Sequence, residues 1–91
     1  MAIEDMYVRI FKALAHPIRL KIVQTLKNGP LCVCNLNENV EFSQSNLSQH
    51  LAILRDKGIL ADRRVGHQVF YRLADPRIPE FFSMMKEIFC R

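Results

Sequence analysis

The sequence predicts a single, mainly α-helical domain with one β-hairpin, and three observations lead to this prediction. Apolar residues recur every three or four positions along most of the 91 residues, which is the spacing of amphipathic helices. Over residues 60–65 and 68–73 the period changes to two, as in strands. Between these segments lies Gly66-His67, a pair suited to a two-residue turn with glycine first. The length predicts one domain over residues 1–91.

The first two expected helices are separated by a proline. Apolar residues recur at helical spacing over residues 3–14, and this helix ends just before His16-Pro17 because the residue before a proline is pushed out of the α region. We interpret His16, which abuts the proline turn, as structural. The second helix has Pro17 in its first turn, carries Arg19 outward and stops at the Asn-Gly pair of residues 28–29.

Two more helices precede the hairpin and one follows it. Pro30 opens a short third helix that runs to about residue 40, and Ser43 is a good N-cap for a fourth helix that ends at residues 57–58. The last helix follows Asp75 and carries a broad apolar stripe. A short helix, a polar connection, a second helix and a basic hairpin form the layout of a winged helix-turn-helix, whose second helix enters the DNA major groove.

The fourth helix carries a polar face without acidic side chains. Short polar side chains of this kind reach base edges, and a helix N-terminus favours a phosphate. The candidate DNA-binding residues on this helix are Ser43, Gln44, Ser45, Asn46, Ser48, Gln49 and His50. Alone, they could merely solvate a helix face, but cations around the hairpin turn and the net charge of +4 favour double-stranded DNA as partner. The hairpin candidates are Arg63, Arg64, His67 and Arg72.

Three segments together resemble one known protein family over essentially the whole chain. FKALAHPIRLKIVQTLKNGPLCVCNL, SQSNLSQHLAILRDKGIL and DRRVGHQVFYRL are similar to the ArsR/SmtB family of dimeric winged-helix transcriptional repressors. The resemblance implies a homodimer joined mainly by the first and last helices. It also implies binding to an imperfect inverted repeat in operator DNA without any cofactor, and release by an inducer.

Cys32 and Cys34 are candidate ligands for that inducer. Residues i and i+2 of a helix point about 200° apart, so we expect chelation to bend the backbone of the third helix. Pro30 places both thiols near the first turn, where amide dipoles favour the thiolate that soft ions bind. The Cys-Val-Cys motif resembles the arsenic-responsive branch of the family, which implies arsenite or antimonite as inducer. It also resembles one metal site of the cadmium- and lead-responsive members.

The match to these branches is incomplete, and Cys90 leaves alternatives open. Arsenic-responsive members often carry a further cysteine where this chain has Asn37, and the cadmium type adds N-terminal cysteines that are absent before Cys32. Cys90 is a tentative third metal ligand, or a small buried residue beside Phe89. A repressor that responds to oxidation or sulfur through Cys32, Cys34 and Cys90 is the alternative, although the helix-two position that resembles its pairing partner holds Gln24.

Other classes of function fit less well. A thiol oxidoreductase would usually have a CxxC motif after a strand with a nearby base, so we expect no enzyme. A second alternative is a protein interaction module that has lost DNA binding. The complete polar face of the fourth helix argues against it. Three cysteines cannot all pair within one chain, and neither a leader-like N-terminus nor an 18-residue apolar run is present. We therefore expect a cytoplasmic protein with reduced thiols and no membrane partner.

Overall fold

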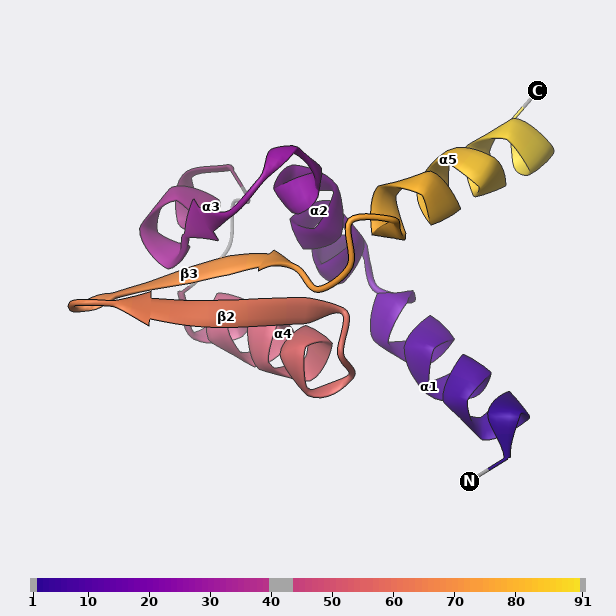
Figure 1. Ribbon diagram of the computed structural model, residues 1–91, viewed down its shortest axis with the longest axis horizontal. Helices are drawn as coiled ribbons and strands as arrows, with labels where there is room; N and C mark the ends of the chain where they lie inside the picture. The colour runs from indigo at the N-terminus through magenta and orange to yellow at the C-terminus, as the bar shows by residue number, and fades with distance from the viewer. Residues whose placement is uncertain (1, 40–43, 91) are drawn as a thin grey trace.

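The computed structural model describes residues 2–39 and 44–90, which form five α-helices and a three-stranded sheet (Figure 1). In chain order the elements are α1 (Ile3–Leu14), α2 (Pro17–Thr25), the 3-10 turn η1 (Leu26–Asn28), β1 (Leu31–Cys32), α3 (Val33–Asn39), α4 (Gln44–Asp56), β2 (Leu60–Val65), β3 (Gln68–Leu73) and α5 (Ile78–Phe89). The helices α3 and α4 are followed by the β2–β3 hairpin, so the chain has the predicted winged helix-turn-helix fold.

The hairpin agrees with the sequence prediction, including both strand boundaries. Strands β2 and β3 pair antiparallel from Leu60 opposite Leu73 to Val65 opposite Gln68. Gly66 has a φ of 62°, a conformation that side-chain-bearing residues rarely adopt, and it occupies the first turn position as expected.

The strand β1 was not predicted and corrects the expected start of the third helix. Pro30 was expected to open that helix, but Leu31 and Cys32 are extended and pair antiparallel with Tyr71 and Phe70 of β3. The sheet order is therefore β1-β3-β2. A two-residue strand is too short to show an alternating pattern in the sequence. It forms by pairing with the edge of β3, which would otherwise be open. The helix α3 begins only at Val33.

The core lies between α2, α3, α4 and one face of the sheet. In α4, apolar residues at helical spacing leave almost no exposed surface, and they pack with buried residues of α2 and α3. The largest buried side chains are Ile22, Val23, Leu26, Leu36, Leu47, Leu51 and Leu54. Because this apolar face of α4 is turned inward, the opposite polar face is turned toward solvent.

The helices α1 and α5 diverge from this core and leave apolar side chains uncovered (Figure 1). In α1 only Ala13 and Leu14 are buried, and α5 has no buried residue. The two helices meet near the core, where the rings of Phe11 and Phe81 lie with their centroids 6.5 Å apart. The exposed apolar residues on α1 and α5, which we name the α1/α5 surface, are Ile3, Met6, Tyr7, Val8, Phe11, Phe81, Met84, Met85, Ile88 and Phe89.

Leu51→Ala tests the packing that orients α4. Leu51 is 1% exposed, and its truncation leaves a cavity, so we expect the free energy of unfolding to fall by about 2–5 kcal/mol. Urea denaturation at one fixed protein concentration measures this loss. Gln49→Ala on the exposed face of the same helix is the control and should change stability by less than about 0.5 kcal/mol. Equal losses for both variants would contradict the assignment of the buried face.

Candidate nucleic-acid interface and thiol site

The exposed face of α4 carries three of the seven predicted DNA-binding residues of this helix. Asn46, Ser48 and Gln49 are exposed, on the side of the helix opposite the buried leucines. Gln44 and Ser45 lie in the first turn of α4, and Ser43 lies outside the described residues. The face is therefore available to a partner without any change in the packing of the domain.

His50 is placed differently from its polar neighbours on α4. It is half-buried and points toward α2, where Arg19 Nε donates a hydrogen bond to His50 Nδ1 at 3.2 Å. The rings of His50 and His16 lie with their centroids 4.5 Å apart. Burial, followed by the charges of His16 and Arg19, lowers the pKa of His50 from its usual 6.5. His50 is therefore a neutral acceptor near pH 7, and it links α4 to α2.

Arg19 was expected to point outward, but it joins three helices. Its Nη1 donates to the carbonyl oxygens of Lys12 and Ala13 at 3.4 and 3.3 Å, near the C-terminal end of α1. A cation is favourable there because the last carbonyls of a helix have no partner within the helix. Together with its bond to His50, Arg19 connects α1, α2 and α4.

His16 has the structural role that the sequence indicated. It is the N-cap of α2, and its Nδ1 accepts a hydrogen bond from the backbone N–H of Ile18 at 3.1 Å. The contact of His16 with His50 could not be predicted, because the two residues are 34 positions apart in the chain.

The strand register divides the cationic residues of the hairpin between two faces of the sheet. Arg64 is opposite Val69, on the face that packs on the core, but near the exposed tip. Arg63 is opposite Phe70 and Arg72 is opposite Ala61, on the other face, since side chains alternate along a strand. His67 lies at the turn, and its side chain and those of the three arginines are exposed.

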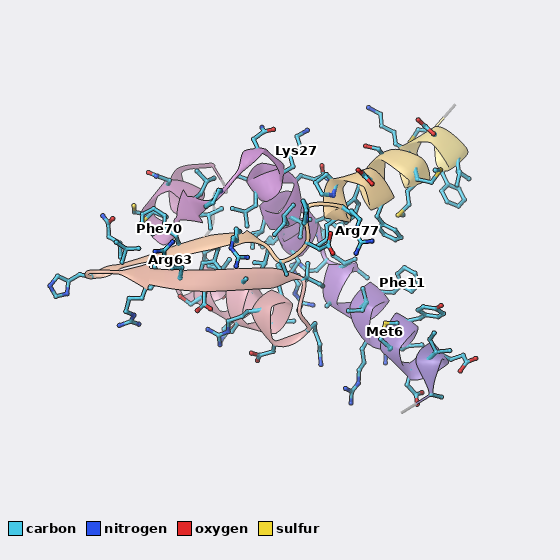
Figure 2. The ribbon with its side chains drawn as sticks, viewed as in Figure 1. Met6, Phe11, Lys27, Arg63, Phe70 and Arg77 are labelled. Atoms are coloured by element: carbon cyan, nitrogen blue, oxygen red, sulfur yellow. The ribbon has the colours of Figure 1, made fainter. Side chains whose placement is uncertain are left out.

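The second face of the sheet is hollowed next to these arginines. A hollow of about 410 Å³ is lined by Pro30, Arg63, Val65, Phe70 and Arg72. Figure 2 labels Arg63 and Phe70, which the register places directly across from one another. The sequence analysis did not find this hollow, because it forms only where β1 brings Pro30 beside β3.

Cys32 and Cys34 lie in contact, contrary to the expectation that the backbone must bend to bring them together. The Cys34 thiol donates a hydrogen bond to Cys32 Sγ at 2.8 Å, measured between the sulfur atoms. The expected divergence of about 200° assumed that both residues belong to one helix. Cys32 is instead the last residue of β1 and Cys34 is in the first turn of α3, and this change of backbone direction turns the two thiols toward each other.

The contact makes the two thiols unequal acids. The hydrogen bond from Cys34 stabilises a thiolate on Cys32 and lowers the pKa of Cys32. The same bond holds the Cys34 proton and raises the pKa of Cys34. Cys32 is buried, whereas Cys34 is exposed, so an ion reaches the pair from the Cys34 side. The pair is suited to a soft ion that binds two sulfurs at once.

Cys90 does not join this pair within one chain. It follows α5 as its C-cap and is exposed within one chain, so Phe89 does not bury it there. The end of α5 lies on the opposite side of the molecule from α3 (Figure 1). Over residues 2–39 and 44–90, no three His, Cys, Asp or Glu side chains gather where they could hold one metal ion. In the same residues, no helix is both long and apolar enough to cross a membrane.

Known proteins are similar in sequence to this chain over most of its length. The model of the bacterial regulatory protein arsR family matches residues 16–62. The biofilm growth-associated repressor of Xylella fastidiosa is 38% identical over 96 residues, which cover 99% of this chain and 84% of that protein. The arsenical resistance operon repressor of Escherichia coli is 48% identical over 73 residues, covering 79% of this chain and 62% of that protein.

Solved structures share the fold. Rv0081 of Mycobacterium tuberculosis superposes with a TM-score of 0.91 at 34% identity, covering 100% of this chain and 92% of that chain. The homodimeric winged helix-turn-helix DNA-binding domain of Mb0332 from Mycobacterium bovis, a possible ArsR-family regulator, has a TM-score of 0.85 at 27% identity. That superposition covers 94% of this chain and 80% of that chain.

The contact of His50 with Arg19 predicts a pH dependence of stability. Because the folded pKa of His50 is lowered, the unfolded chain takes up its proton first as the pH falls. The stabilisation by neutral His50 is complete above about pH 6.5 and is lost as the pH falls through the lower folded pKa. Urea denaturation at several pH values between about 7.5 and 5 measures it. The stability advantage of the wild type over His50→Gln, which keeps an acceptor but does not titrate, should shrink toward the acid end.

His67→Gln is the matched control for this titration. His67 is exposed at the turn of the hairpin, so this variant should follow the pH dependence of the wild type. Parallel curves for His50→Gln and the wild type over the whole range would contradict the role given to His50.

Proposed function

The chain belongs to the arsR family of bacterial regulatory proteins, and from this premise we propose a homodimeric repressor that releases its operator DNA when arsenite or antimonite binds Cys32 and Cys34. The observation that carries the proposal is the contact of the two sulfur atoms at 2.8 Å, at the junction of β1 and α3. Trivalent arsenic and antimony are thiophilic, and a pair of thiols already in contact offers them two sulfur ligands. The arsenical resistance repressor of Escherichia coli, at 48% identity, supports this choice of inducer.

The α1/α5 surface supports the homodimer. Large side chains such as Phe89, which is 76% exposed, are costly to leave in water, and monomeric proteins rarely expose a long contiguous apolar patch. Two copies joined through α1 and α5 bury these side chains against each other. The domain of Mb0332, which has the same fold, is homodimeric, and this supports the association of two copies.

The exposed face of α4 and the tip of the hairpin support operator binding. Asn46 and Gln49 can donate and accept hydrogen bonds at base edges, while Arg64 and His67 extend beyond the domain at the hairpin tip. A dimer repeats both elements, so it matches a sequence repeated with inverted symmetry.

Release follows from the position of the thiol pair. Cys32 ends the strand that pairs with β3 of the wing, and Cys34 lies in the first helix of the helix-turn-helix. An ion that binds both sulfurs replaces the S–H···S hydrogen bond by two bonds of fixed angle, and it thereby sets the orientation of α3 relative to the wing. The two states need differ in DNA affinity by only about 1–3 kcal/mol for an allosteric change of about 5- to 150-fold.

Fluorescence anisotropy of the reduced protein on the inverted repeat upstream of its own gene tests the inducer. Arsenite should weaken DNA binding by about 5- to 150-fold. Cys32→Ser and Cys34→Ser should bind DNA as the wild type does and no longer respond, because one sulfur of the pair is lost. Cys90→Ser is the matched control and should still respond. If both Cys32→Ser and Cys34→Ser still release DNA with arsenite, the assignment of the inducer site is wrong.

Two substitutions separate base contacts from phosphate contacts. Gln49→Ala should weaken binding to the operator by about 1–3 kcal/mol and leave binding to unrelated DNA unchanged. Arg64→Ala should weaken binding to the operator and to unrelated DNA alike. It should also lower the slope of log affinity against log salt concentration by about 1. Lys21→Ala, on an exposed position of α2, is the charge control and should change neither. Equal behaviour of Arg64→Ala and Lys21→Ala would remove Arg64 from the DNA interface.

A further inference from the structure

We propose that the hollow on the second face of the sheet binds a small thiol that carries carboxylates, and that this thiol supplies the third sulfur to trivalent arsenic held by Cys32 and Cys34. The inference rests on the proposed function and names a co-ligand of the same site. A peptide-sized thiol with carboxylate groups is the chemical class that the lining of the hollow fits.

The strand register places the thiols and the hollow on one face of the sheet. Cys32 lies opposite Phe70, and Phe70 lies opposite Arg63, so the three form one row across β1, β3 and β2. Side chains directly opposite one another in a sheet are neighbours with Cβ atoms about 4.5–5.5 Å apart. Arg72 follows Phe70 by two residues in β3 and shares its face. The hollow therefore begins one side chain away from Cys32.

The lining of the hollow selects an anion with an apolar part. Pro30, Val65 and Phe70 provide apolar surface, and Arg63 and Arg72 provide two guanidinium groups. The ion pairs among described residues engage Arg55 and Arg77 instead, so Arg63 and Arg72 keep their charge for another partner. Guanidinium binds carboxylate through two parallel hydrogen bonds, so a pair of arginines is well suited to a ligand with two carboxylates. The volume of about 410 Å³ lies in the range of small-molecule sites, about 300–1,000 Å³.

The chemistry of trivalent arsenic connects the two sites. Arsenic in arsenous acid, As(OH)₃, exchanges its three hydroxide groups for three sulfur ligands. Cys32, Cys34 and the small thiol each form an As–S bond, and each As–O bond that breaks releases hydroxide. The three thiol protons convert the hydroxides into three waters, and arsenic keeps its oxidation state. Cys34 is exposed, so an arsenic atom on the pair is open to a third sulfur held over Phe70.

Native mass spectrometry of the 91-residue chain, under reducing conditions with arsenite, tests the inference. Reduced glutathione, which has two carboxylates, and neutral 2-mercaptoethanol are the probes. We expect a complex of protein, arsenic and glutathione to form at lower thiol concentration than the 2-mercaptoethanol complex, by about tenfold or more. Without arsenite, no glutathione adduct should appear.

The arginines are tested by substitution on the two faces of the sheet. The double variant Arg63→Gln, Arg72→Gln should remove the preference for glutathione and leave the 2-mercaptoethanol complex unchanged. Arg64→Gln, which removes a charge from the other face, should keep the preference. Arg72→Lys should fall between them, because it keeps the charge and loses the paired hydrogen bonds.

The outcomes separate this inference from the proposed function. If arsenic binds through Cys32 and Cys34 but glutathione and 2-mercaptoethanol are equivalent, the hollow is not a thiol site and the proposed inducer stands. If Cys90→Ser loses arsenic, a protein thiol supplies the third sulfur. The hollow is then not a thiol site, and Cys90→Ser no longer serves as a control for the proposed inducer. If no arsenic binds to the wild type, the proposed inducer fails and the inference with it.

Discussion

The pairing of β1 with β3 is the constraint on which the candidate site depends. Two residues, Leu31 and Cys32, pair with Tyr71 and Phe70, and this ends the extended segment at the residue before α3. The change from strand to helix turns Cys34 toward Cys32 and places Cys32 in one row with Phe70. Without β1, both cysteines would lie in one helix, pointing apart, and the edge of β3 would be open. One short strand thus brings together the thiol pair, the hollow and the wing.

Much of this architecture follows directly from the sequence, where a pattern is long enough to be read. The hairpin was predicted to its boundaries, because two six-residue alternating segments flank a glycine that only a turn requires. The helices α1, α2, α4 and α5 follow from apolar spacing and prolines. The strand β1 could not be predicted, because two residues have no period and Pro30 indicates a helix start as readily as an extended segment.

The sequence predicted which residues form the candidate thiol site but not how they are arranged in space. Cys32 and Cys34 were identified as a pair, but the assumption of a single helix gave the wrong relation between them. Likewise, the positions of Arg19 in α2 and His50 in α4 suit the exposed faces of these helices. Only tertiary packing brings Arg19 into contact with the end of α1 and with His50. Cys90 lies at the end of a helix without buried residues, so its neighbour in sequence, Phe89, gives no shelter within one chain.

Two connections lead to α4, the helix proposed to bind DNA. Arg19 bonds the carboxyl end of α1 to His50, so the helix that carries part of the proposed dimer surface is tied to α4. The thiol pair is connected to α4 in a different way. Cys34 lies in α3, which precedes α4, and Cys32 lies in β1, which pairs with β3 of the wing. The first connection links the proposed dimer surface to α4, and the second links the thiol pair to α4. The inducer proposed for the thiol pair acts through the second connection, whereas the bonds of Arg19 belong to the first.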